Sequence, residues 1–279
     1  MKRIYYLCAL VFTFCITACN SNDPNNPTDS ELEESYTLKT DNGRLDGKFS
    51  VSETKRVGFS QGNLQYIASS GTWRFAKYQW EIVGNNENSS ISSTYSGPID
   101  LFGWGTGNNP TKTSTHYKDY SSFSEWGKNA IINGGNKNNA WRTLTYDEWD
   151  YVLNTRENAN KLRGQAKINN VYGGILLPDA CVLPNGISFS SNALNKYSIN
   201  EWAKLENAGA VFLPCGGRRY GTEAEDAGNW GAFWSSTPKI VSGAINGQAA
   251  AYCIHCTNLT VFDYVRQQGL AVRLVQDVN

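Results

Sequence analysis

Histidine is scarce in this sequence, and neither sign of charge is in excess. Two histidines stand among 279 residues, and 25 basic residues face 25 acidic ones. A zinc site needs about four nitrogen or sulfur donors, and two histidines leave most of that set unfilled. A near-neutral chain also lacks the basic surface of nucleic-acid-binding proteins. We therefore expect no nucleic-acid partner and no cofactor held by histidines.

The common catalytic signatures are missing as well. The chain contains no GxSxG nucleophile elbow, no HExxH zinc motif and no phosphate-binding P-loop. Carboxylate pairs of the glycosidase type stay open, because such pairs come together only in space. Asp147 and Glu148 are adjacent, but acidic residues in the first turn of a helix explain them better.

An export signal stands at the amino terminus. Lys2 and Arg3 precede a short apolar run, and the tetrapeptide ITAC that ends at Cys19 resembles a bacterial lipobox. We expect cleavage that removes residues 1–18, followed by acylation of the Cys19 thiol. Several acyl chains on one residue anchor a protein firmly to a membrane. The alternative is an ordinary signal peptide with an incidental cysteine.

The mature chain divides into a tether and one domain. Residues 20–36 are polar, acidic and rich in asparagine and proline, a composition typical of flexible linkers. We assign residues 19–46 to the lipidated cysteine and tether, and residues 47–279 to a single domain. No later apolar segment is long enough to span a bilayer.

Two helices are marked by capping boxes, in which a hydroxyl and a glutamate three residues later each bond the other's backbone amide. One helix is expected to begin after Thr145, with Glu148 as the partner, and the other after Ser198, with Glu201. Apolar residues follow on one face of each helix. Gly209 is expected to end the second helix.

Alternating or continuous apolar runs predict the strands. Residues 49–66 show period-two positions offset by Gly62, which indicates two strand pieces joined by a bulge. The remaining predicted strands are residues 173–178, 209–214, 231–237, 249–257, 259–265 and 270–276. The last four are separated by short turns, so we expect them to pair antiparallel. The fold class is therefore α+β, with many loops.

The segments VGFSQGNLQY, WRTLTYDEW, GGILLPD, AGAVFLP, FWSST and GLAVRLVQD occur in this order over residues 49–277. Together they resemble a family of Bacteroidetes surface lipoproteins whose domain is similar to the Fibrobacter major paralogous domain. More distantly, they resemble the formylglycine-generating enzyme branch of the C-type lectin fold. The resemblance implies two helices flanking a twisted antiparallel sheet, and a ligand surface on the carboxyl-terminal strands and loops.

Two further expectations follow from this resemblance. In relatives diversified by a retroelement, substitutions concentrate in the stretch that corresponds to residues 249–268 here, so this stretch is either actively diversified or a fast-changing binding face. The catalytic residues of the related enzymes are not matched, because this chain has too few histidines for a three-histidine iron site and its late cysteines have the wrong spacing.

The sequence AYCIHC near the carboxyl end places Cys253 and Cys256 in a CxxC spacing around His255. On a strand, alternation directs these cysteines to opposite faces, which argues against one metal ion between them. A redox pair usually opens a helix. We therefore expect Cys256 in the core, with Cys253 and His255 on the outer face. A disulfide between Cys181 and Cys215 remains an option for an exported chain.

Exposed aromatic and polar residues of the carboxyl-terminal strands are the ligand candidates, because rings supply contact area and polar neighbours fix orientation. These candidates are Tyr252, Cys253, His255, Asn258, Phe262, Asp263, Tyr264 and Gln267. Phe262 and Tyr264 are expected on one face, with Val261 and Val265 facing the core. The alternative is that the rings only cover the domain's own loops. The acidic loop with Glu223, Glu225 and Asp226 is a weaker candidate for calcium.

The sequence thus predicts a lipid-anchored outer-membrane protein at the cell surface that binds a ligand without transforming it. The ligand is expected to be a glycan or a protein on another cell or on a host. Two alternatives remain: an oxidoreductase of the formylglycine-generating type, and a structural subunit of a surface or fimbria-like assembly.

Overall fold

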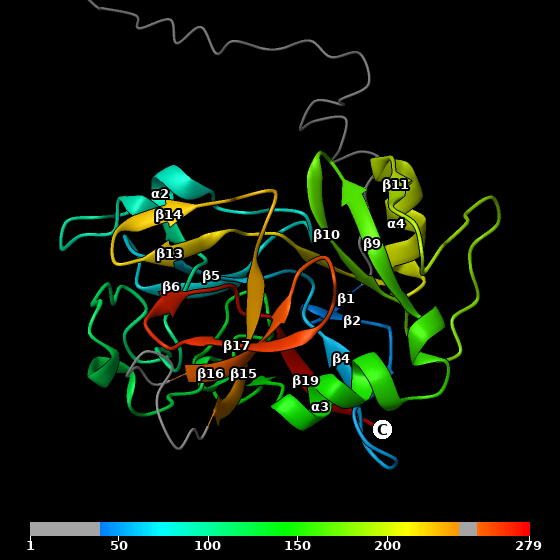
Figure 1. Ribbon diagram of the computed structural model, residues 1–279, viewed down its shortest axis with the longest axis horizontal. Coiled ribbons are helices and arrows are strands. Elements are labelled where there is room, and N and C mark those ends of the chain that lie inside the picture. Colours follow the sequence, from blue (N-terminus) through cyan, green and yellow to red (C-terminus); the bar gives the residue numbers. More distant parts are fainter. Residues whose placement is uncertain (1–39, 240–249) are drawn as a thin grey trace, which may run out of the picture.

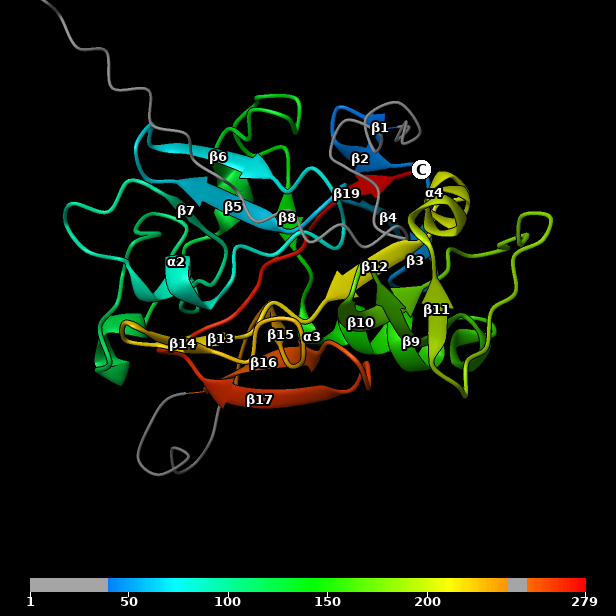
Figure 2. The ribbon, with the colours of Figure 1, turned by 90° about the horizontal axis from the view of Figure 1, so that it is seen from above.

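A computed structural model describes residues 40–239 and 250–279, apart from the side chains of Ala250 and Tyr252. Cys19 and the expected tether up to residue 39 lie outside the described residues. Within them the chain is a mixed α+β structure in which strands form several small, mainly antiparallel sheets. The expected α+β class is confirmed at this level. The strands are not gathered into one twisted sheet, since Figures 1 and 2 show several sheets facing different ways.

The two ends of the described chain meet in one sheet. Its strand order is β3-β4-β19-β8. The members are β3 (Phe49–Ser50), β4 (Arg56–Phe59), β19 (Leu274–Val278) and β8 (Arg142–Thr143). Val275 pairs with Phe59 in this sheet, so the last strand closes onto one of the first. A small hairpin of β1 (Thr40–Asp41) and β2 (Arg44–Leu45) precedes it.

This hairpin contacts the core and the segment after β4. Leu45 is 1% exposed and belongs to the same core cluster as Phe49 and Phe59. The amide of Gln61 also donates to the carbonyl of Gly43. Residues 40–46 are polar on average, yet they contribute one buried leucine to this core cluster.

The strands before and after Gly62 belong to different sheets. β4 pairs with β3 and β19, whereas β5 (Leu64–Ile67) pairs with β6 (Thr72–Phe75) and β7 (Pro98–Ile99). The two expected strand pieces are present, but the expectation that a bulge joins them is wrong. Gly62 instead lets the chain turn tightly, since a Cβ there would lie 2.4 Å from the carbonyl oxygen of Ala76.

Both expected capping boxes are present. The hydroxyl of Thr145 accepts from the amide of Glu148 at the start of α3 (Tyr146–Asp150), which continues as a π-helical turn at Tyr151–Thr155. Ser198 and Glu201 cap α4 (Ile199–Asn207) in the same way. Gly209 follows α4 with a φ of 90°, as expected for the residue that ends it.

A further short α-helix and several single turns lie in the loops. They are α2 (Asn85–Ser89), η1 (Tyr117–Tyr120), η2 (Trp126–Lys128) and η4 (Ala159–Lys161). Residues 100–141 otherwise carry little regular structure. Their tryptophans fill the core: Trp104, Trp126 and Trp141 are each at most 3% exposed.

α4 packs against a four-stranded sheet with the order β11-β9-β10-β12. The members are β11 (Asn195–Tyr197), β9 (Arg163–Ile168), β10 (Val171–Leu176) and β12 (Val211–Pro214). The predicted strands at residues 173–178 and 209–214 are β10 and β12, and they pair antiparallel. Trp202 of α4 contacts Phe212 of β12 with ring centroids 5.8 Å apart.

The carboxyl-terminal third contributes two more sheets. The first has the order β15-β16-β17, with β15 (Ala232–Lys239), β16 (Ala250–His255) and β17 (Val261–Val265). The second has the order β14-β13-β18, with β14 (Glu223–Glu225), β13 (Arg218–Tyr220) and β18 (Gln268–Gly269). Three of the four predicted terminal strands pair antiparallel, as expected. The fourth, β19, joins the amino-terminal sheet instead.

The β15-β16-β17 sheet separates two parts of the core. Phe233 and Ile254 belong to one cluster with Phe59, Trp149 and Val275. Trp234 and Cys253 belong to a second cluster of buried rings. Figure 2 shows β17 along the outer side of this sheet, and each residue of β17 is partly exposed. The sheet is therefore buried on both faces at the first half of β15 and along most of β16, and it reaches solvent at the second half of β15 and at β17.

Candidate functional site

Four aromatic rings meet beside the β15-β16-β17 sheet, where the second core cluster reaches solvent. Phe262 and Tyr264 come from β17, His255 ends β16, and Trp230 precedes β15. Antiparallel pairing sets Phe262 opposite Cys253 and Tyr264 opposite Ala251, so these side chains share one face of the sheet. We call the four residues Trp230, His255, Phe262 and Tyr264 the aromatic cluster.

Each ring of the aromatic cluster contacts two of the other three. Ring centroids are 5.6 Å apart for Trp230 and His255 and 6.1 Å apart for His255 and Phe262. They are 6.0 Å apart for Phe262 and Tyr264 and also for Trp230 and Tyr264. All four residues are partly exposed, so the cluster forms a rigid apolar surface with polar atoms at its rim. Such a surface can contact a sugar ring or a protein side chain.

Arg218 fixes one side of this surface. Its guanidinium lies 5.1 Å from the ring centroid of Trp230, and its Nη1 donates to the hydroxyl of Tyr264 at 2.9 Å. Its Nη2 also pairs with Glu225 at 2.9 Å and with Asp226 at 3.2 Å. The rings are thus held by a cation whose charge is already balanced by two carboxylates.

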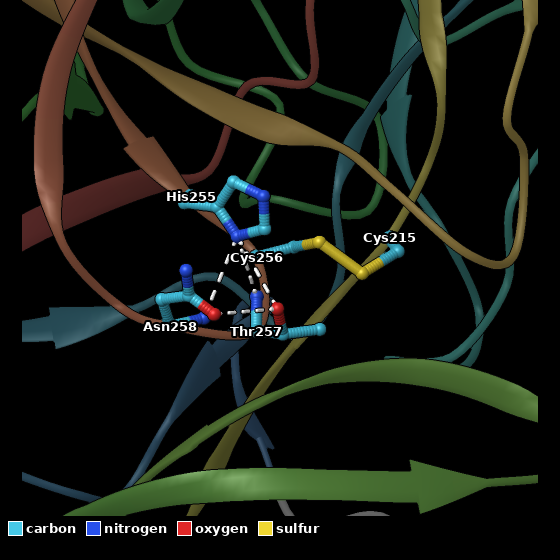
Figure 3. The surroundings of a disulfide bond; sticks show 5 residues. All are labelled: Cys215, His255, Cys256, Thr257 and Asn258. Carbon is cyan, nitrogen blue, oxygen red and sulfur yellow. Dashed lines mark hydrogen bonds between the residues drawn. A yellow bond between two sulfur atoms is a disulfide. The ribbon is translucent and has the colours of Figure 1, made fainter.

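His255 has a defined protonation state in this arrangement. Its Nδ1 accepts from the backbone amides of Thr257 at 3.3 Å and Asn258 at 3.4 Å (Figure 3). In the neutral ring the proton therefore sits on Nε2. Burial lowers the pKa of His255 below its usual value. The side chain presents an N–H donor beside the rings of Trp230 and Phe262 at neutral pH.

A disulfide between Cys215 and Cys256 holds the end of β16 (Figure 3). Cys215 directly follows β12 and Cys256 directly follows β16, so the bond joins two sheets. The Cys181–Cys215 option is wrong, because Cys215 is bonded elsewhere and Cys181 is a free, partly buried thiol. Sequence order favoured two cysteines beside prolines, but the close approach of Cys215 and Cys256 depends on how β12 packs against β16.

Two of the expected ligand residues lie inside the protein. Cys253 is fully buried next to Trp234, and burial raises the pKa of its thiol well above the usual value. Gln267 is 1% exposed. The expectation of an outward-facing Cys253 is wrong because the second core cluster covers this face of β16, which period-two alternation alone cannot reveal.

The other expected residues have varied positions. His255, Phe262 and Tyr264 join the cluster, and Val261 packs on the opposite face against the first core cluster, as alternation predicts. Asp263 forms an ion pair with Lys239. Asn258 is exposed in the turn after His255. The side chain of Tyr252 lies outside the described part of the structure.

Trp230 and Arg218 were not among the residues singled out from the sequence. Trp230 stands in the segment GNWGAFW, directly before a predicted strand. A tryptophan between an acidic loop and the start of a strand could have been predicted from the sequence to be partly exposed. Arg218 carried no such signal, because its contact with Trp230 goes with a long-range backbone bridge between Gly217 and Gly231.

The acidic loop has a structural partner. Glu225 and Asp226 both pair with Arg218, and Glu223 lies at the end of β14 opposite Tyr220. Among the residues that the structure describes, no group of three or more histidine, cysteine, aspartate or glutamate side chains is placed to hold a metal ion. The calcium expectation thus gains no support from this loop.

Searches of family models, curated proteins and solved structures gave no match to this chain. Within the described ranges, no helix is both long enough and apolar enough to cross a bilayer.

Proposed function

We propose that this protein is exported, anchored by lipid at Cys19, and binds a ligand through the aromatic cluster without transforming it. The observation that carries the proposal is the set of partly exposed rings of Trp230, His255, Phe262 and Tyr264, held by Arg218. Rigid rings with a polar rim are the usual centre of a binding surface, because they give contact area at little cost in side-chain entropy.

Two features support the exported location. The tetrapeptide before and including Cys19 fits a lipobox, and the bond between Cys215 and Cys256 is of a kind that persists in oxidising compartments. We further propose the outer membrane and the cell surface as the location, and a C-type-lectin-like arrangement of the domain. This last proposal rests on the order of sequence segments and is compatible with the mixed α+β structure.

The location is tested by labelling cells with an alkyne fatty acid during expression. The wild-type chain should take up the label and Cys19→Ser should not, and protease added to intact cells should degrade only the wild-type chain. Uptake of label by the Cys19→Ser variant would contradict the anchor. Labelling together with full protection from protease would contradict the surface location.

The binding role is tested with the mature protein on immobilised glycans and on extracellular proteins of host and bacterial origin. Any probe that binds is then presented to a variant with Trp230→Ala, Phe262→Ala and Tyr264→Ala. Binding should fall at least about 100-fold, because central aromatic residues each contribute about 1–2 kcal/mol or more. Tyr117→Ala is the matched control, since this partly exposed ring stacks on His116 away from the cluster.

Outcomes of three kinds would overturn the proposal. The first is unchanged binding in the triple variant while its melting temperature confirms folding. The second is consumption of oxygen with a thiol peptide in the presence of copper or iron, which would indicate an oxidoreductase. The third is recovery only as part of a large assembly with no saturable binding, which would indicate a structural subunit.

A further inference from the structure

A polar cavity of about 260 Å³ lies beside the turn that joins β16 to β17. Its walls come from the start of β9 with Asn160 before it, from residues 191–192, and from residues 257–259. Side-chain amides dominate this lining, with Asn160, Gln165, Asn192 and Asn258 all contributing. The cavity adjoins the aromatic cluster, because the amides of the 257–259 turn bond the ring of His255.

The wall at residues 191–192 is held by Asn195, which is 9% exposed. Its Nδ2 donates to the carbonyls of Gln165 and Ser190, both at 2.8 Å, and its Oδ1 accepts from the amide of Ser190 at 2.9 Å. Gly164 permits this approach, since a Cβ there would lie 2.7 Å from the carbonyl oxygen of Ser190. The loop is thus fixed against β9, and the amide of Asn192 has a defined place.

The wall at residues 257–259 is held in three ways. The Cys215–Cys256 bond fixes its start, and Leu259 at its end is 1% exposed with a φ of 50°. Nη1 of Arg163 donates to the carbonyl of Leu259 at 2.6 Å. A leucine rarely adopts positive φ, so the surrounding contacts must hold Leu259 there.

Arg163 is the one charged residue among those that line the cavity. No carboxylate lies within ion-pair distance of it in the described part of the chain, and Asp150 acts on it only from farther away. Burial lowers the pKa of Arg163, and an arginine stays protonated at neutral pH. The contrast with Arg218 is clear, because that guanidinium is already paired with two acids.

The amide groups of the lining are also available. The side chains of Asn160, Gln165 and Asn192 have no hydrogen-bond partner among the described residues, and each is exposed to solvent. Side-chain amides both donate and accept, which suits the hydroxyls of a sugar. A single guanidinium suits one carboxylate, with which it can form two parallel hydrogen bonds.

We propose that this cavity binds an acidic sugar, with the carboxylate on Arg163 and the hydroxyls on the amides of Gln165, Asn192 and Asn258. The inference rests on the proposed binding function and deepens it by naming the ligand class. A longer acidic glycan can fill the cavity with one unit and lay the next unit against the aromatic cluster, since both sites share the turn after His255.

The test uses the full mature protein and saturation-transfer-difference NMR with sodium glucuronate, glucose and sodium sulfate at equal ionic strength. Glucuronate should receive saturation and bind at least about ten-fold more tightly than glucose, because a charge-assisted bidentate contact is roughly twice as strong as a neutral one. Sulfate should displace glucuronate only weakly, since it lacks the hydroxyls that the amides would bind.

Two variants separate loss of the site from loss of the fold. Arg163→Gln should lower glucuronate affinity to that of glucose. Asn192→Asp keeps the bond from Arg163 to Leu259 but adds a repelling carboxylate, and it should lower glucuronate affinity at least about ten-fold. Arg56→Gln, at an exposed arginine of β4, is the matched control and should change nothing. Melting curves confirm folding of each variant.

The inference is overturned by equal binding of glucuronate and glucose, by equal competition from sulfate, by no saturation transfer to either sugar, or by glucuronate binding that survives both variants. If glucuronate fails while the aromatic cluster still binds another probe, the inference alone falls. If glucuronate binding depends on Arg163 but the triple variant of the aromatic cluster binds its probe as tightly as wild type, the proposed role of the cluster is wrong and the proposed sugar site in the cavity stands.

Discussion

Arg218 lies over the indole ring of Trp230, 5.1 Å from its centroid. The same guanidinium reaches Tyr264 and two carboxylates, so one side chain joins the acidic loop to the rings of the terminal sheet. Cation–π contacts at partly exposed sites contribute about 0.5–1 kcal/mol. The aromatic cluster therefore keeps its shape through contacts within the protein as well as through packing on the core.

Arg218→Gln should lower the free energy of unfolding by about 1 kcal/mol and shift the fluorescence of Trp230, because the ring loses the cation above it. The measurement is chemical denaturation followed by tryptophan emission. Arg56→Gln serves as the comparison, since this exposed arginine on β4 has no such ring contact among the described residues. Equal stability of the two variants would mean that the contact contributes nothing measurable.

Removal of the disulfide should lower the free energy of unfolding considerably more than Arg218→Gln does. Cys215 and Cys256 are 41 residues apart, and closing a loop of this length in the unfolded chain is expected to stabilise the fold by about 4 kcal/mol. The double variant Cys215→Ala with Cys256→Ala should show this loss in denaturant titrations. Cys181→Ala, at a free thiol, is the control and should stay within about 1 kcal/mol of wild type. A large loss in the control alone would contradict the assigned pairing.

Glu206 should make stability depend on pH in the direction opposite to that of an ordinary carboxylate. It is 2% exposed, and neither carboxyl oxygen has a hydrogen-bond partner among the described residues. Burial raises its pKa from 4.5 to about 8, although the nearby Arg273 lowers it. The folded state thus binds more protons than the unfolded state between these values, so its contribution to stability falls as pH rises from about 5 to 8.

Glu206→Gln mimics the protonated carboxyl and should remove this dependence. The free energies of unfolding of the variant and the wild type should be similar at pH 5, and the variant should be the more stable at pH 8. Glu201→Gln is the control at a partly exposed position of the same helix, where hydrogen bonds from Ser198 lower the pKa of the carboxyl instead. A constant difference between Glu206→Gln and wild type across this range would contradict the raised pKa.

His255 should make the stability depend on pH in the direction opposite to that of Glu206. Burial lowers its pKa below the usual 6.5, so the unfolded state binds the proton first as pH falls. Its contribution to stability is therefore lost below about pH 6.5. Protonation would also direct Nδ1–H at the amides of Thr257 and Asn258. His255→Asn should flatten the dependence of stability on pH between pH 7 and pH 5, and NMR titration of the His255 ring should report a pKa below the usual 6.5.

Local signals in the sequence predicted the local structure well. Thr145 with Glu148 and Ser198 with Glu201 locate both principal helices, because a capping box depends only on residues three apart. The terminal hairpin and the shared face of Phe262 and Tyr264 also follow from short-range alternation. These features need no knowledge of the rest of the chain.

Long-range features could not be predicted in the same way. The partner of Cys215, the burial of Cys253 and the separation of β4 from β5 all depend on how distant segments pack. Period-two alternation assumes that one face of a strand is exposed to solvent. The assumption fails for β16, because a core cluster rich in aromatic residues packs on each of its faces. The cavity at Arg163 could not be predicted from the sequence either, since its walls come from three segments that are far apart along the chain.

The bond from Cys215 to Cys256 makes the structure of the proposed binding region depend on whether these two cysteines have been oxidised. In a reducing compartment both cysteines would stay as thiols, and the turn after β16 would be held by hydrogen bonds and packing alone. Passage into an oxidising space would then lock that turn in a single chemical event. Under the export and binding roles proposed above, competence to capture a ligand would arrive with secretion, after the chain has left its place of synthesis.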